Sequence, residues 1–150
     1  MIKKITIAID AMGGENAPTK NLQGLDLFIK KNKFNNDFQI NLYGNKEIID
    51  KEILKLNISK EFLNILHTEN VVSNKDSPLT AIKNSKESSM WKSIKAQIDG
   101  EADISLSAGN TGVLLVISKM ILKMMPEVSK PALAGLWPNK KGMSVVLDLG

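Results

Sequence analysis

The 150-residue chain contains neither cysteine nor arginine. The absence of cysteine excludes disulfides, thiolate metal sites and cysteine nucleophiles. Because all 20 basic residues are lysines, an anion bound to this chain meets compact ammonium groups and backbone amides instead of the planar fork of a guanidinium. His67 is the only histidine, which argues against a transition-metal site. We expect His67 to have a structural role, with catalysis as the alternative.

Long apolar runs are also missing. The longest, over 113–125, is interrupted by Ser118, Lys119 and Lys123 and is too short to span a bilayer. The first residues lack the apolar segment and small-residue cleavage site of a signal peptide. The net charge of +4 is a mild excess without a dense basic run, which argues against nucleic-acid binding. We therefore expect a cytoplasmic protein.

Hydrophobic residues make up 43% of the chain and charged residues 24%, which is typical of a soluble globular protein. Segments with strand character alternate with segments of helical periodicity, without an internal repeat or a low-complexity linker. Strands are predicted over 2–9, 38–43, 62–67, 103–107, 131–137 and 143–149, and helices over 19–31, 46–56, 78–100 and 110–124. This order favours an α/β fold, with a mostly parallel sheet covered on both faces and a late antiparallel excursion.

A loop of small residues, Ser107-Ala108-Gly109-Asn110-Thr111-Gly112, joins a predicted strand to a predicted helix. The backbone can approach a ligand closely here because there is little side chain in the way. The first amides of a helix have no acceptor within the helix, and the helix dipole favours negative charge near them. The loop therefore predicts a site for a phosphate, a nucleotide or a carboxylate at Asn110, Thr111 and Gly112.

Two other segments, Asp10–Gly14 and Asp148–Gly150, follow strands of the parallel, buried type. Because the carboxyl ends of parallel strands meet at one edge of a sheet, we expect both segments to share a rim with the loop at 107–112. Taken alone, either aspartate is equally consistent with capping a loop amide or pairing with a lysine. The glycine pair of the first segment matches neither the dinucleotide-binding nor the P-loop spacing, so a tight turn is its alternative.

Lys83 and Lys86 lie three residues apart in the predicted helix over 78–100, so we expect them on one helix face. Together with Ser88 and Ser89 they form a second candidate anion-binding group. The alternative is a solvated helix face with a capping serine, and a second helical turn that restarts near 87–89.

Six segments occur in one order along the chain. They are Asp10-Ala11-Met12-Gly13-Gly14, Asp76-x-Pro78, Ser88-Ser89-Met90, Ser107-Ala108-Gly109-Asn110-Thr111-Gly112, Lys130-Pro131-Ala132-Leu133 and Leu147-Asp148-Leu149-Gly150. Over essentially its whole length, the chain resembles the bacterial phosphate acyltransferases of the PlsX family, which are acyl-ACP:phosphate acyltransferases of phospholipid synthesis. Members of that family are considerably longer. We therefore expect residues 1–150 to be a single α/β unit in the amino-terminal half of a longer protein.

The resemblance implies a three-layer α/β/α sandwich similar to isocitrate and isopropylmalate dehydrogenases, a homodimer, and no cofactor or metal. The implied reaction is attack of inorganic phosphate on the thioester of acyl-acyl carrier protein, which gives acyl phosphate and free carrier protein. Phosphate is largely a dianion near neutral pH, so no strong base is required and catalysis rests on positioning and oxyanion stabilisation. Peripheral membrane contact is implied through a segment outside this chain.

The resemblance also implies roles for particular residues. We expect the residues of the glycine loop to cradle phosphate or the oxyanion, Lys83 or Lys86 to supply charge, and Asp10 and Asp148 to orient loops or the pantetheine arm. Lysine stands at 83, 86 and 130 where relatives often have arginine, which keeps the charge and loses the fork. The catalytic candidates are Asn110, Ser107 and Asp10, and the substrate-binding candidates are Gly13, Gly14, Lys83, Lys86, Ser88, Ser89, Gly109, Thr111, Gly112 and Asp148.

Three alternatives stay open. A phosphotransacetylase-like enzyme would use acyl-CoA in place of acyl-ACP, and the sequence does not separate the two. A dehydrogenase of the isocitrate type would need an acidic metal-binding cluster and substrate arginines, and the chain has no arginine. The third is a non-catalytic binding or assembly module. We expect residues 1–150 alone to lack transferase activity, because the sheet and its rim are incomplete.

Overall fold

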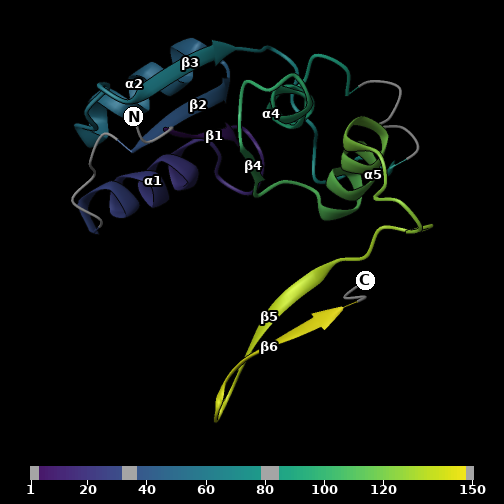
Figure 1. Ribbon diagram of the computed structural model, residues 1–150. Coiled ribbons are helices and arrows are strands. Elements are labelled where there is room, and N and C mark those ends of the chain that lie inside the picture. Colours follow the sequence, from purple (N-terminus) through teal and green to yellow (C-terminus); the bar gives the residue numbers. More distant parts are fainter. Residues whose placement is uncertain (1–3, 32–36, 79–84, 148–150) are drawn as a thin grey trace.

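A computed structural model describes residues 4–31, 37–78 and 85–147. Four parallel strands alternate with helices, and a separate antiparallel pair of strands follows (Figure 1). The parallel strands are β1 (Ile5–Asp10), β2 (Phe38–Gly44), β3 (Leu63–His67) and β4 (Ile104–Ser107); the helices are α1 (Thr19–Lys31), α2 (Lys46–Leu56), α4 (Ser89–Ile98) and α5 (Thr111–Leu122); the antiparallel pair is β5 (Ala134–Asn139) and β6 (Gly142–Leu147). The predicted α/β class, with a mostly parallel sheet and an antiparallel excursion, is confirmed.

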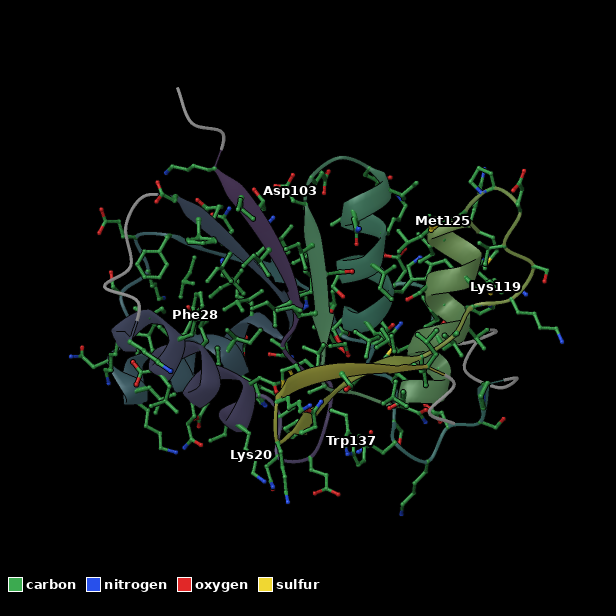
Figure 2. All side chains as sticks on the ribbon, turned by 60° about the horizontal axis from the view of Figure 1, so that its bottom comes forward. Lys20, Phe28, Asp103, Lys119, Met125 and Trp137 are labelled. Carbon is green, nitrogen blue, oxygen red and sulfur yellow. The ribbon has the colours of Figure 1, made fainter. Side chains whose placement is uncertain are left out.

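The order of the parallel strands is β3-β2-β1-β4. After β1 the chain builds outward through β2 and β3, and then returns to the other side of β1 to form β4. The point between β1 and β4 is therefore a topological switch point, where sheets of this kind bind ligands beyond the carboxyl ends of their strands. The register pairs Asp10 with Ser107 across this point. At the amino end of β4, Asp103 Oδ2 accepts a hydrogen bond from the Thr6 amide at 2.9 Å (Figure 2).

Helices cover both faces of the sheet, but not evenly. Helices α1 and α2 pack on one face and bury Leu22, Ile40 and Ile49, each of which stabilises the fold by about 1.5–3 kcal/mol. Helix α4 packs on the other face against Ala8 and Tyr43. Helix α5 packs on α4 instead of on the sheet. The α1 side of β4 is consequently left open.

The helix boundaries follow local sequence signals. Helix α2 begins after Asn45, whose side-chain Oδ1 accepts a hydrogen bond from the Ile48 amide at 3.1 Å, and ends before Asn57, which adopts the left-handed conformation that terminates helices. The predicted bounds of α1 and α2 agree with the structure. The prediction over 78–100 agrees in part: residues 85–87 form a turn in which Glu87 has φ +70°, and α4 begins at Ser89, where a restart was the alternative. Residues 79–84 lie outside the described residues.

The pairing of β5 with β6 confirms the predicted antiparallel excursion, but the expected surroundings of its second strand are wrong. The strand over 143–149 was expected to be buried and to end at the rim of the parallel sheet. In the structure β6 pairs with β5, and Val145 and Leu147 remain 65% and 63% exposed. The turn at 139–142 folds the chain back on itself before it reaches the parallel sheet, and the hairpin extends away from it (Figure 1). Asp148 to Gly150 lie outside the described residues.

In the described part of the chain, no helix is long and apolar enough to cross a membrane.

Candidate functional site

The loops after β1 and β4 are in direct contact. A Cβ atom added to Gly13 would lie 2.4 Å from Asp10 Oδ2, and one added to Gly109 would lie 3.4 Å from Gly13 Cα. Gly14 has φ +97°, and a Cβ there would lie 2.7 Å from the carbonyl oxygen of Ala108. Because a side chain at Gly13 or Gly14 would clash with these atoms, glycine at both positions allows the two loops to touch. Their predicted meeting at one edge of the sheet is confirmed.

Asp10 brings a buried carboxyl to this contact. Its Oδ2 accepts a hydrogen bond from the Ser107 hydroxyl at 2.7 Å, and its Oδ1 accepts one from the Met12 amide at 3.3 Å. Burial raises the pKa of Asp10 above its usual 3.8, and interactions with two serine hydroxyls and two loop amides lower it in part. The carboxyl ties the β1 loop to the end of β4.

Ser107 connects Asp10 to the glycine loop. Its hydroxyl donates to Asp10 and accepts a hydrogen bond from the Gly109 amide at 3.1 Å. The hydroxyl proton is therefore already used in the hydrogen bond to Asp10. The Ser107 oxygen can offer a further group only its remaining lone pair. This geometry makes Ser107 a poor donor to an anion while Asp10 is ionised.

Asn110 caps α5 with its whole side chain. Its Oδ1 accepts a hydrogen bond from the Val113 amide at 3.2 Å, while its Nδ2 donates to the carbonyl oxygens of Asn74 and Asp76 at 3.2 and 3.0 Å. Both amide hydrogens and the carbonyl oxygen are used, so the side chain holds the loop over 74–76 against the start of the helix. The catalytic role of Asn110 stays a prediction, and the hydrogen bonds show that its side chain positions this loop.

The first two amides of α5 complete the anion-binding features of the loop. Thr111 and Gly112 occupy the first two positions of the helix, where an amide has no acceptor within the helix. A Cβ added to Gly112 would lie 3.4 Å from Pro78 Cγ, so Pro78 borders this end of the helix. The amides and the helix dipole favour an anion here, as the sequence predicts.

In the second candidate group, at the start of α4, the two serines are buried. Ser88 is buried and caps the helix by accepting a hydrogen bond from the Trp91 amide at 3.1 Å, which confirms the capping alternative. Ser89 is also buried and lies against Asp10. Lys86 is exposed and lies in a turn, so the expected helix face is wrong for it. Lys83 lies outside the described residues.

A groove of about 390 Å³ opens beside the loop contact, between α1 and strands β1 and β4. Its walls are apolar and include Ile9, Phe28 (on α1, Figure 2) and Leu106, which is half exposed. One end is polar, because Asp10 and Ser107 line it. The groove therefore extends from an apolar region to the edge of the candidate anion-binding loop.

Residues 5–150 match a family described as "Fatty acid synthesis protein". The chain belongs to this family. Among its curated relatives, a protein of Pelagibacter ubique is 50% identical over 150 residues, one of Parvibaculum lavamentivorans 41% over 155 and one of Bradyrhizobium diazoefficiens 39% over 151. All three are named "Phosphate acyltransferase". The matches cover 100% of this chain but 44%, 41% and 42% of those relatives, so the chain spans less than half their length.

In this member of the fatty acid synthesis family, His67 makes contacts that fit the expected structural role. Its Nδ1 accepts a hydrogen bond from the Lys46 amide at 3.2 Å and so satisfies the first amide of α2, while its Nε2 lies 3.5 Å from Glu69. Among residues 4–31, 37–78 and 85–147, no cluster of three or more histidine and acidic side chains is placed to hold a metal ion.

Sequence reasoning missed two parts of the site in this family member. One is Asn21 on α1, whose Nδ2 donates to the carbonyl oxygens of Ala11 and Gly13, at 2.9 Å each, and fixes the β1 loop. The other is the apolar groove. The alternation of Ile104 and Leu106 with serines in β4 was a signal that one face of this strand is apolar. No local pattern indicated that this face would be left uncovered.

Proposed function

We propose that the protein is an acyltransferase that moves a fatty acyl group from acyl-acyl carrier protein to inorganic phosphate, giving acyl phosphate for phospholipid synthesis. One observation carries this proposal: an anion-binding loop and an apolar groove meet at Asp10 and Ser107. An acyl phosphate joins an apolar chain to an anionic group, so its site needs an apolar and an anion-binding environment side by side. The family, and relatives named "Phosphate acyltransferase", support the same reaction.

The reaction requires little from the side chains. A phosphate oxygen attacks the thioester carbonyl carbon, the new C–O bond forms, and the C–S bond breaks as the thiolate leaves and takes a proton from solvent. Since phosphate near neutral pH is already largely a dianion, no strong base is needed. The amides of Thr111 and Gly112 are suited to hold it or to stabilise the oxyanion.

The groove is the natural place for the acyl chain in this reaction. Its volume of about 390 Å³ falls in the range of small-molecule pockets, and its apolar wall continues from Leu106 to Phe28. The thioester carbonyl would then lie at the polar end, beside the glycine loop. This arrangement holds the two reacting groups next to each other, which is the main contribution that positioning makes to catalysis.

The proposal is tested by removing one backbone donor from α5. Thr111→Pro deletes the amide hydrogen at the first helical position, where proline is well tolerated, and Asn110 already has the extended backbone (ψ 113°) that precedes proline. We expect acyl phosphate formation by the full-length protein to fall by about 10²–10³-fold, the effect of losing one oxyanion donor. The measurement is acyl phosphate release with acyl-ACP and phosphate, and with acyl-CoA in parallel.

Thr111→Ala is the matched control, because it removes the side chain and keeps the amide. It should retain activity close to that of the unmodified protein. Equal activity of the proline and alanine variants would remove this amide from the mechanism. A faster reaction with acyl-CoA than with acyl-ACP would assign the alternative acyl carrier.

A further inference from the structure

The Asp10 carboxyl lies among hydrogen-bond donors. The Ser107 hydroxyl donates to Oδ2 and the Met12 amide donates to Oδ1. An ionised carboxylate can only accept, so this arrangement fixes the direction in which the serine proton points. The Gly109 amide occupies a lone pair of the same serine oxygen. With Asp10 ionised, Ser107 therefore turns its proton toward the Asp10 carboxylate, and that proton is not available to a bound anion.

We propose that Asp10 is a positioning residue that withholds the Ser107 proton from the anion, so that the site binds an anionic substrate more tightly when Asp10 is neutral. A neutral Asp10 carries a proton of its own and can donate it to the serine oxygen. The serine proton is then free to rotate toward the polar end of the groove, which both residues line. The proposal rests on the proposed function only in taking the anion to be the substrate.

The surroundings of Asp10 make this exchange feasible. The residue is buried at the switch point, and burial raises its pKa above the usual 3.8, which favours the neutral form. On β2 its register partner is Tyr43, whose pKa burial also raises, so that side chain stays neutral. From α4, the neutral Ser89 faces it. Among the described residues, no charged side chain contributes to the shift of Asp10.

This switch of the hydrogen-bond donor from Ser107 to Asp10 also explains why these two polar residues lie where an anion is expected. An ionised carboxylate and a serine lone pair both repel a dianion, so the resting site opposes tight binding of phosphate. Weak ground-state binding of a substrate is compatible with fast turnover, since only interactions stronger in the transition state accelerate the reaction. A serine proton released when Asp10 becomes neutral would act at this same place.

The test uses sulfate as the probe, because sulfate stays a dianion between pH 5 and 8 whereas phosphate titrates. Binding to the full-length protein is measured by calorimetry across this range, at constant ionic strength, for the unmodified protein and for Asp10→Asn. An asparagine keeps the carbonyl for the Met12 amide and places an NH₂ group against Ser107, which frees the serine proton at every pH.

For the unmodified protein we expect sulfate affinity to increase as the pH is lowered. For Asp10→Asn we expect affinity at pH 7 to increase about tenfold, the effect of one added hydrogen bond to a charged group, and to vary less with pH. Ser107→Ala should leave affinity at pH 7 almost unchanged and should show a shallower pH dependence, which comes only from the loss of the Asp10 charge. The double variant should bind sulfate less tightly than Asp10→Asn, because it lacks the serine proton.

Each contrary result overturns the proposal. A tenfold gain that persists in the double variant would mean that removal of the Asp10 charge suffices without the serine proton. A large loss in Ser107→Ala at pH 7 would mean that the hydroxyl already contacts the anion. If Asp10→Asn does not fold, the test compares how sulfate affinity changes with pH in the unmodified protein and in Ser107→Ala. Equal slopes of affinity against pH would reject the proposal. Because sulfate binding needs no acyl donor, a failure of the proposed acyl transfer would show separately, in the assay for acyl phosphate.

Discussion

At the scale of single residues, two glycines near the groove differ in the space around them. A methyl group at Gly13 would lie 2.4 Å from Asp10 Oδ2 and 2.9 Å from Ser107 Oγ, both held in hydrogen bonds. A methyl group at Gly24, on α1, would meet nothing within 4 Å. The first glycine is required by packing, whereas the second only lowers the helical propensity of α1.

We therefore expect Gly13→Ala and Gly24→Ala to act in opposite directions. The first should destabilise the protein by about 1–3 kcal/mol through overpacking. The second should stabilise it by about 0.5–1 kcal/mol, because alanine is the better residue within a helix. Urea denaturation of both variants measures the change in the free energy of unfolding. A destabilised Gly24→Ala variant would contradict the open space beside this residue.

At the scale of helices and strands, two asparagines share one capping role. Asn45 caps α2 and Asn110 caps α5, each by accepting a hydrogen bond from the amide three residues later. Only Asn110 also binds a second segment, through its two bonds to the carbonyl oxygens of Asn74 and Asp76. Asn110 therefore links the stability of a helix to the position of a loop beside the candidate site.

Replacing each asparagine by alanine separates these two effects. Asn45→Ala should cost about 1 kcal/mol of stability, the usual effect of a lost N-cap, and Asn110→Ala should cost more, because it also loses the two hydrogen bonds to the loop. Only Asn110→Ala should also strongly reduce acyl phosphate formation, because it releases the loop over 74–76 from the start of α5. Thermal unfolding and the transferase assay are the two measurements. Full activity of Asn110→Ala would show that this link does not matter for the reaction.

The same scale shows what a sequence can predict. The bounds of α1 and α2 were predictable because capping and periodicity are local signals. The meeting of the β1 and β4 loops was predictable because parallel strands end at one edge. The position of β6 was not, since an apolar strand pattern does not tell which sheet the strand joins. The use of all the Asn110 hydrogen bonds was also hidden, because its partners Asn74 and Asp76 are 36 and 34 residues away.

At the scale of the whole molecule, several apolar surfaces lack a cover. Ile104 and Leu106 on β4 are 45% and 50% exposed. On the hairpin, Leu136 and Trp137 (labelled in Figure 2) are 69% and 60% exposed. Isolated two-stranded hairpins are marginally stable in water, and exposed apolar patches mark surfaces of interaction. The part of the chain that the structure describes therefore does not complete its own packing.

Residues 1–150 produced alone should accordingly show no transferase activity. The groove would stay open to water on the β4 side, and water in a reaction site weakens every electrostatic interaction within it. The comparison is acyl phosphate synthesis by residues 1–150 against synthesis by the full-length protein at equal concentration. Measurable synthesis by residues 1–150 would show that this part already contains a working site.

The hydrogen bond between Ser107 and Asp10 joins residues 97 positions apart in the chain. A contact over such a separation forms only after a costly loop closure, so it belongs to the late stages of folding. Anion binding at the β1–β4 edge therefore depends on a finished sheet, and a nascent chain cannot acquire it before β4 has been synthesised and paired. An anion that binds only this finished state also stabilises it. An anion bound at this edge would then act as a folding ligand for the sheet that holds it.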